Sequence, residues 1–357
     1  VSAEHGSWPF VWQKLSETEL SAELRQSLQT QGFTWLDTVS AEHGGWPFVW
    51  QKLSVTELST ELRQSLQTQG FTWLDTVLAE HGSWPFVWQK LSETELSAEL
   101  RQSLQTQGFT WLDTVSAEHD SWPFVWEVLW QAGLSAELNQ SLHTKGLTWL
   151  DTVSAEHGSW KFVWEALRQA ALSAELHHSL HTKGLTWLDT VSAKHGSWKF
   201  VWEALWKAEI SEDLREALQI LALKWLEDAN PENNDWPFIW QSIVNKSDRK
   251  SELHNKMLMI GRLWLEQAPQ SHRARPYMYG FYAAAITVFD SDLINSGFAW
   301  MRQQPIPNSA WHLIWCPLWD QCPERHTELG DIAIRIQASK PASNEGYGQI
   351  YKRLNTV

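Results

Sequence analysis

The sequence predicts an all-α protein, an α-solenoid of about nine to ten helix-turn-helix repeats. Two observations carry this prediction. The motif EHGSWPFVW returns, nearly unchanged, with a period of 38 residues, and the apolar residues of each unit follow helical spacing. A single helix pair cannot bury both of its faces, whereas a stack of such pairs can, so a solenoid follows.

The repeats fall into two groups along the chain. Residues 1–228 hold six near-identical units, which begin at Val1, Val39, Val77, Val115, Val153 and Val191. Residues 229–357 continue the same solenoid with divergent units. We place unit seven at about 229–267 and unit eight at about 268–304. Unit nine begins near Pro305, and Tyr347–Leu354 would be the first helix of a tenth.

The first helix of each unit, helix A, is expected at about Trp8–Leu15. Ser7 is suited to the N-cap, and Pro9 falls in the first turn, where its missing N–H costs nothing. One apolar stripe follows from i, i+3, i+4 and i+7 spacing: Trp8, Val11, Trp12 and Leu15. Phe10 lies off this stripe, and we expect it to pack on a neighbouring unit.

The second helix, helix B, is expected at about Ser21–Thr38, extending toward the next EHG turn. Gly32 lies in mid-helix, and its counterparts in later units are glycine or alanine. Glycine there costs about 1 kcal/mol relative to alanine, so we expect close helix approach with a tryptophan opposite. Trp35 and Leu36 complete the apolar face, and Gly6 would end the preceding helix as its C-cap.

Composition narrows the functional classes. The net charge is −14: residues 229–357 hold 13 Lys+Arg and 12 Asp+Glu, so residues 1–228 carry the whole excess of acid. Such a surface repels phosphate, and we expect no nucleic-acid partner. The chain has no long apolar run for a membrane span, no signal peptide, and 2 Cys, which favour a reducing, cytoplasmic location. It opens in mid-repeat, so we expect it to be part of a larger protein.

The unit resembles tetratricopeptide (TPR) repeats, and more closely the Trp-rich TPR-like arrays with two tryptophans four apart and a later Trp-Leu pair. Trp8, Trp12, Trp35 and Leu36 carry this resemblance. The period is 38 rather than 34 residues, and no GxxxxGK[ST] motif is present. The resemblance implies a TPR-like superhelix. It also implies the sensor region of a prokaryotic STAND (NACHT or NB-ARC) NTPase or caspase-like conflict protein, with its effector domain missing on the N-terminal side.

The tryptophans have two interpretations. Their helical spacing favours a packed core over a stacking platform for sugars, bases or peptides. Three of them break the pattern at variable positions and are expected to be exposed: Trp130, Trp206 and Trp319. Trp130 and Trp206 are therefore candidates for contact with a partner.

The histidines also have a structural and a functional interpretation. One histidine per EHG turn is too sparse for a metal array, and we expect these histidines to make hydrogen bonds between repeats. His177, His178 and His181 lie on one B helix and are further partner-binding candidates. His177 and His181, four apart, could also form a two-ligand metal pair, although a solvated helix face is the preferred interpretation.

Unit nine contains a weaker metal candidate. His312 and Cys316 are four apart, as are Cys322 and His326, and two thiolates with two imidazoles suit zinc. The spacing matches no known zinc finger, so two unpaired thiols remain the default and we expect neither metal nor cofactor.

No catalytic grouping stands apart from the repeat, and we do not expect an enzyme. The first hypothesis is a protein-binding scaffold for a protein or peptide ligand, acting as the recognition arm of a larger prokaryotic signalling or antiviral-defence protein. The alternative is a structural solenoid whose apolar ends stack on further copies.

Overall fold

The computed structural model describes residues 5–303, 310–338 and 345–355, and these residues form helices, turns and loops without any strand. The all-α solenoid prediction is confirmed, since paired helices recur at the predicted period. Residues 1–4 of the first unit and the predicted start of unit nine near Pro305 lie outside the described residues.

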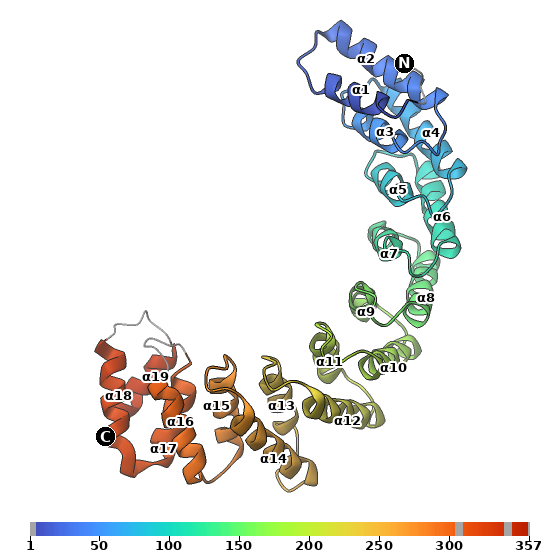
Figure 1. The fold of residues 1–357 in the computed structure, drawn as a ribbon. Helices are drawn as coiled ribbons and strands as arrows, with labels where there is room; N and C mark the ends of the chain where they lie inside the picture. The colour runs from blue at the N-terminus through green and yellow to red at the C-terminus, as the bar shows by residue number, and fades with distance from the viewer. Residues whose placement is uncertain (1–4, 304–309, 339–344, 356–357) are drawn as a thin grey trace. The chain divides into compact units, whose positions relative to one another are not determined.

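Short A helices alternate with longer B helices along the chain (Figure 1). The A helices are α1 (Trp8–Ser16), α3 (Trp46–Ser54), α5 (Trp84–Ser92), α7 (Trp122–Gln131), α9 (Trp160–Gln169), α11 (Trp198–Lys207), α13 (Trp236–Val244), α15 (Arg275–Ala285), α17 (His312–Gln321) and α19 (Glu345–Leu354). The B helices are α2 (Ala22–Thr38), α4 (Thr60–Thr76), α6 (Ala98–Thr114), α8 (Ala136–Thr152), α10 (Ala174–Thr190), α12 (Glu212–Asp228), α14 (Glu252–Gln267), α16 (Ser291–Gln303) and α18 (His326–Ala338). A 3-10 turn, Pro323–Arg325, precedes α18.

The chain divides into two compact units, Val1–Leu180 and His181–Val357, and the division falls inside α10. Within the first unit, the A helices α3, α5, α7 and α9 form one layer and their B helices form the other (Figure 1). No helix among the described residues combines the length and the apolar composition needed to cross a membrane.

Three tryptophans per repeat form the core of the near-identical repeats, and an indole N–H there typically donates to a backbone carbonyl oxygen, whereas those of Trp264 and Trp311 are buried without a partner. In the second repeat, Trp50 donates to Leu66 within the helix pair at 2.9 Å, and it is 1% exposed. Trp46 donates back to Leu36 of the first repeat at 3.2 Å and stacks on Trp73, with ring centroids 5.1 Å apart. The indoles therefore tie each repeat to itself and to its neighbour while burying large apolar area.

The glycines at the Gly32 position allow this packing. A Cβ on Gly32 would lie 2.8 Å from Trp12 Cζ2 and 3.3 Å from Leu53 Cδ1 of the next repeat. The same contact recurs at Gly70, where Trp50 Cζ2 would be 2.9 Å away. The predicted close approach opposite a tryptophan agrees with these distances.

The ends of the helices differ from the prediction. Helix α2 ends at Thr38, and Val39 follows in extended conformation, so the helix does not continue to the EHG turn. Gly44, the counterpart of Gly6 that follows α2, is consequently not a helix C-cap, and Gly6 itself lies in a turn directly before α1. Among the described glycines, Gly133 has positive φ. Ser7 occupies the N-cap position of α1 without any side-chain capping bond.

The EHG histidines replace the expected serine cap. Nδ1 of His43 accepts the N–H of Gly45 at 3.0 Å, and its ring lies edge-on to Trp35 with centroids 5.3 Å apart. A hydrogen bond across a whole repeat is made by His272, whose Nε2 lies 2.8 Å from the carbonyl oxygen of Glu232. The histidines thus order the turn that starts each A helix.

Candidate interaction surfaces

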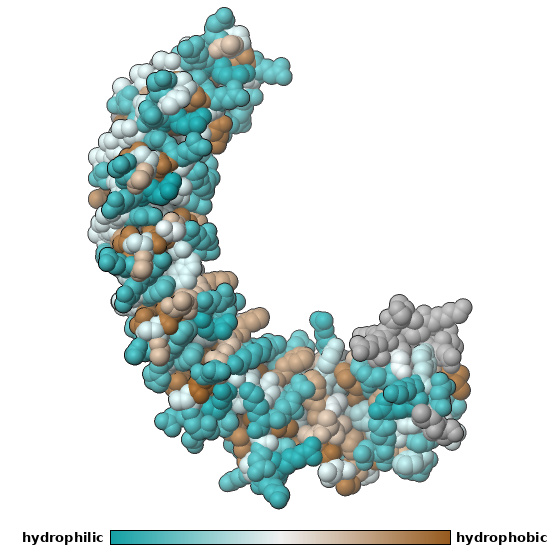
Figure 2. Space-filling model, turned by 180° about the vertical axis from the view of Figure 1, so that it is seen from behind, coloured by the Kyte–Doolittle hydropathy of each residue, from teal (hydrophilic) through white to brown (hydrophobic). Residues whose placement is uncertain are grey.

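A row of phenylalanines projects from the A helices, contrary to the packing expected for Phe10. Five of them are exposed by the following fractions: Phe10 62%, Phe48 64%, Phe124 36%, Phe162 64% and Phe200 58%. At about 100° per residue, this position lies about 200° round the helix from both flanking tryptophans, so it points away from the core. We call the four of them in the first unit the phenylalanine row; Phe200 holds the same repeat position in the second unit, and Phe86 on α5 is half-buried. In Figure 2, hydrophobic side chains likewise reach the surface in separate recurring patches among hydrophilic ones.

The phenylalanine row borders a groove between α7 and α9, both in the first unit. The groove has a volume of about 660 Å³. Phe124 and Trp130 line it from α7 and Phe162 lines it from α9, while Trp126 and Val163 form its buried floor. Its walls are thus aromatic, and its width is set by the spacing of adjacent A helices.

Three acidic residues line the same groove: Asp120, Glu127 and Glu165. Arg168 donates to both carboxylate oxygens of Glu165, at 2.9 and 2.6 Å, and these hydrogen bonds lower the pKa of Glu165. The ammonium of Lys161 lies 4.8 Å from the ring centroid of Phe162, so this aromatic face already attracts a cation. The groove combines aromatic faces with negative charge.

Trp130 is half-buried, as its variable position allows. It tilts against Trp126 at 41°, with centroids 4.8 Å apart, and against His143 at 43° and 4.9 Å. Burial lowers the pKa of His143 and so disfavours a charged imidazole beside Trp130. The Trp130 ring thus lacks the covering cations found at Trp206.

Trp206 contradicts the expected exposure, since it is only 4% exposed. It stacks on Trp202 at 5.1 Å, and two cations cover it: Lys246 Nζ lies 4.8 Å and the Arg215 guanidinium carbon 5.5 Å from its ring. Both cations also donate to the carbonyl oxygen of Trp206, at 3.2 and 2.8 Å. Burial, followed by repulsion from Arg215, lowers the pKa of Lys246. Charged neighbours bury this ring, and the sequence pattern could not reveal them.

Trp319 was also expected to be exposed and is buried, at 8% exposure. It is sandwiched between Trp315, at a centroid distance of 4.7 Å, and His326, at 3.9 Å. Stacking on both faces removes it from the surface.

The four residues of the weak zinc candidate serve other purposes. His326 stacks on Trp319 and its Nε2 lies 2.8 Å from that residue's carbonyl oxygen. Cys316 and Cys322 are both buried, and burial raises the pKa of Cys316 to about 11 and raises that of Cys322. His312 begins α17. Within the described ranges, no three or more His, Cys, Asp or Glu residues gather in a way that could hold a metal ion.

The three histidines of α10 differ in exposure. His178 is exposed, His177 is half-buried, and His181 is 9% exposed, so His181 does not offer the solvated surface expected of it. His181 occupies the repeat position of Gln67, whose buried amide donates to the Glu95 carbonyl of the next repeat at 3.1 Å. This position faces protein, which explains the burial of His181.

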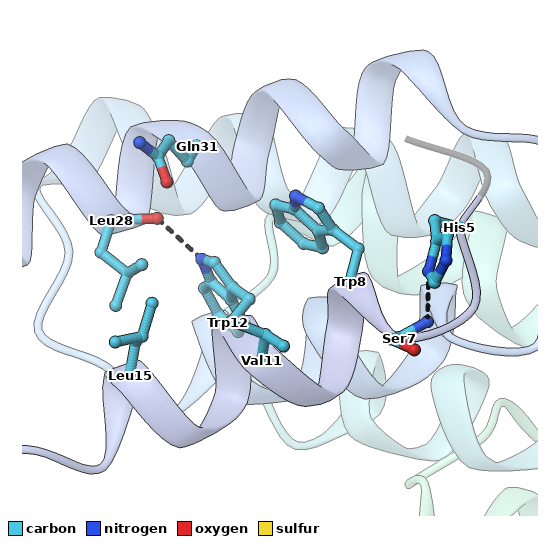
Figure 3. Close-up of a pocket in the computed structure, with 8 residues that line it drawn as sticks. All are labelled: His5, Ser7, Trp8, Val11, Trp12, Leu15, Leu28 and Gln31. Atoms are coloured by element: carbon cyan, nitrogen blue, oxygen red, sulfur yellow. Dashed lines mark hydrogen bonds between the residues drawn. The ribbon is translucent and has the colours of Figure 1, made fainter. Parts of the chain in front are cut away.

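A second apolar surface is the outer side of the first helix pair (Figure 3). A pocket of about 540 Å³ there is lined by Trp8, Trp12, Leu28 and neighbouring residues. Val11 is 53% and Leu15 46% exposed, whereas their counterparts in the second repeat, Val49 and Leu53, are 2% and 0% exposed. In the array, this same face is what receives the preceding repeat.

No protein-family model, curated protein or solved structure matches this chain. Trp130 was expected to be exposed and is half-buried, lining the groove, and the phenylalanine row was not predicted. The signal was available, because the angle of Phe10 from the apolar stripe can be computed from its position alone.

Proposed function

We propose that this chain is a protein-binding repeat scaffold that recognises its ligand along the A helices. The observation that carries the proposal is the phenylalanine row. Phe48 and Phe162 are each 64% exposed although every other large apolar residue of their helices, such as Trp50 and Val163, is buried. A phenylalanine that recurs at one position of the A helices and is exposed on most of them offers anchors of the kind that dominate protein interfaces.

We further propose that the array is the recognition arm of a larger prokaryotic signalling or defence protein and carries no reaction of its own. The resemblance of the repeats to Trp-rich TPR-like sensor regions supports this role. Ligand binding along the A helices would then bias an effector domain elsewhere in the protein. Identifying the domain encoded beside this array in its gene tests this part, and a gene without any signalling or protease domain would contradict it.

A displayed library of peptides and small domains, selected on the full chain, tests ligand recognition. Selected ligands are compared on two variants with intact cores. The first replaces the phenylalanine row by serine. The second replaces an exposed row of the B helices by alanine: Thr34, Thr72, Thr110, Thr148 and Thr186.

We expect the serine variant to lose at least about tenfold in affinity, as removal of aromatic anchors does, while the threonine variant keeps wild-type affinity. Circular dichroism verifies that both variants are folded. Equal binding to both variants, or a selection that enriches no ligand, would contradict the proposal.

End-to-end self-association is the second candidate function, favoured by the exposed face of the first helix pair. Leu53 of the second repeat lies 3.3 Å from the place that a Cβ on Gly32 would take, which shows how a repeat covers such a face. Light scattering across a hundredfold dilution series tests it. Self-association predicts that the molecular mass of the wild type rises with concentration and that Val11→Glu keeps the monomer mass. A wild-type mass that stays at the monomer value over the whole series would contradict self-association.

A further inference from the structure

Trp130 and Trp206 occupy the same repeat position, at the end of an A helix two repeats apart, but their surroundings differ. Lys246 and Arg215 cover the ring of Trp206, at 4.8 and 5.5 Å. Counted from the first tryptophan of each A helix, the residue of the fifth repeat that corresponds to Lys246 is Ala170. The residue of the fourth repeat that corresponds to Arg215 is Asn139. Trp130 therefore has the same aromatic side chain without the two cations.

A third cation position shows the same difference. Between α11 and α13, Lys199 Nζ lies 4.8 Å from the ring centroid of Phe238 and 2.8 Å from Asp235 Oδ1. The residue corresponding to Lys199 in α7 is Pro123, and the ring corresponding to Phe238 is Phe162. In the second unit the chain thus supplies cations to both rings, whereas the α7–α9 groove has alanine, asparagine and proline at those three positions. The groove keeps one cation of its own, Lys161, whose Nζ lies 4.8 Å from the ring centroid of Phe162, so Trp130 is the ring without a cation.

The charge of the α7–α9 groove suits the same kind of occupant. Asp120 and Glu127 line it, and both are exposed. Glu165 is engaged by Arg168, so the other two carboxylates provide the available negative potential. The volume of about 660 Å³ admits an extended lysine or arginine side chain with its flanking backbone.

We propose that the groove between α7 and α9 binds a basic segment of a protein partner, placing a lysine or arginine side chain against Trp130. The Trp130 ring attracts the cation through its face, and Asp120 and Glu127 supply the counter-charge, while Lys161 already lies over Phe162 on the other wall. This inference rests on the proposed protein-binding function, and it specifies a basic ligand at one position of the phenylalanine row.

Calorimetric titration of the full chain with the peptide acetyl-(Gly-Arg)3-amide at low salt tests the site. The matched peptide acetyl-(Gly-Glu)3-amide serves as the charge-reversed control. We expect saturable binding of the arginine peptide only. Trp130→Ala weakens it about tenfold or more, since loss of a desolvated cation–π contact has an effect of that order. Failure of the arginine peptide to bind, or equal binding to Trp130→Ala, overturns the proposal.

A second variant supplies the missing cations from the chain itself. Asn139→Arg with Ala170→Lys places at Trp130 the two cations that cover Trp206, with His143 unchanged, and we expect it to weaken the arginine peptide at least about tenfold, because the ring is then occupied. Ala132→Lys is the matched control, since Ala132 holds the same position one repeat earlier, where the A helix ends in Ser92 instead of tryptophan. Equal weakening by Ala132→Lys would show general charge repulsion and overturn the site.

Two carboxylate variants, one inside the groove and one outside it, distinguish attraction of the peptide to the groove from attraction to the acidic surface as a whole. Glu127→Gln is expected to weaken the arginine peptide about threefold, whereas Glu137→Gln, on the exposed face of α8, leaves it unchanged. Equal effects of the two would contradict a site at the groove.

The proposed groove site and the proposed protein-binding function can be refuted separately. Library ligands that need the phenylalanine row but not Trp130 would overturn this site alone, and Trp130-dependent arginine binding without any row-dependent ligand would overturn only the broader function.

Discussion

Replacing Gly108 by alanine perturbs the contact on which the helix pair depends. A Cβ there would lie 2.6 Å from Trp88 Cζ2 and 3.3 Å from Leu129 Cδ1, against an ordinary contact of 3.4–4 Å. Trp88 cannot yield easily, because it is 1% exposed and donates to the Leu104 carbonyl at 2.8 Å. The added methyl group must therefore displace a buried indole or separate the two helices.

The magnitude follows from two opposing terms. Alanine is favoured over glycine in a helix interior by about 1 kcal/mol, and overpacking of a core costs about 1–3 kcal/mol. We expect Gly108→Ala to lower the free energy of unfolding by about 1 kcal/mol. Gly146→Ala is the graded comparison, since its Cβ would lie 3.0 Å from Trp126, and its loss should be smaller.

Urea unfolding followed by tryptophan fluorescence measures both variants. A lower midpoint with an unchanged slope reports lost stability rather than a changed unfolded state. The sixth repeat gives an independent indication, because Ala222 stands at this position and the Trp202–Leu218 hydrogen bond there is 3.3 Å long. A stabilised Gly108→Ala, or a larger loss in Gly146→Ala than in Gly108→Ala, would refute the close-packing argument.

Three further predictions concern the core and the thiols. Leu53 is 0% exposed, and Leu53→Ala should lower the free energy of unfolding by about 2–5 kcal/mol in the same urea assay. Its counterpart Leu15 is 46% exposed, and Leu15→Ala should lower it by less than about 1 kcal/mol. Similar losses in the two variants would show that the first helix pair is covered in solution. Trp50→Phe removes the indole N–H that donates to the Leu66 carbonyl oxygen and puts a smaller ring in a buried site, for an expected loss of about 1–3 kcal/mol. A neutral Trp50→Phe would contradict the role given to the indole N–H. Burial raises the pKa of Cys316 from 9.0 to about 11, so the contribution of the neutral thiol to stability is complete below pH 9 and is lost as pH rises toward 11. The free energy of unfolding of Cys316→Ala should therefore fall less steeply over this pH range than that of the wild type. Parallel curves of stability against pH would contradict a buried neutral thiol.

The repeat architecture could be predicted from sequence because duplication presents the same helix and packing signals several times along the chain. The Trp8, Val11, Trp12, Leu15 stripe and the small residue at Gly32 each recur, so spacing alone indicated which faces meet. Helix ends were less predictable. Ser7 has a favourable side chain for capping, yet the nearby His5 imidazole accepts its N–H at 3.3 Å, a competition that propensity does not express.

The surface could be predicted only in part, because exposure depends on neighbours distant in sequence. Trp206 is covered by Lys246, which lies on the next repeat, and Trp319 by His326 from the following helix. Neither partner belongs to the repeated motif, so periodicity could not place them. Trp130 stays half-buried because its repeat has Asn139 at the position where the sixth repeat has Arg215. The effect of this difference on exposure can be recognised only when the neighbours of Trp130 and Trp206 are compared in the structure.

We propose above that a protein ligand binds along the phenylalanine row of the A helices. Photo-crosslinking tests this binding most directly, with p-benzoylphenylalanine placed at Phe48 or Phe162 and, as the control, at Thr72 on a B helix. All three positions are exposed, so the probe should leave the core intact. We expect a library-selected ligand to crosslink from positions 48 and 162 and not from position 72. Crosslinking from position 72 alone would contradict it.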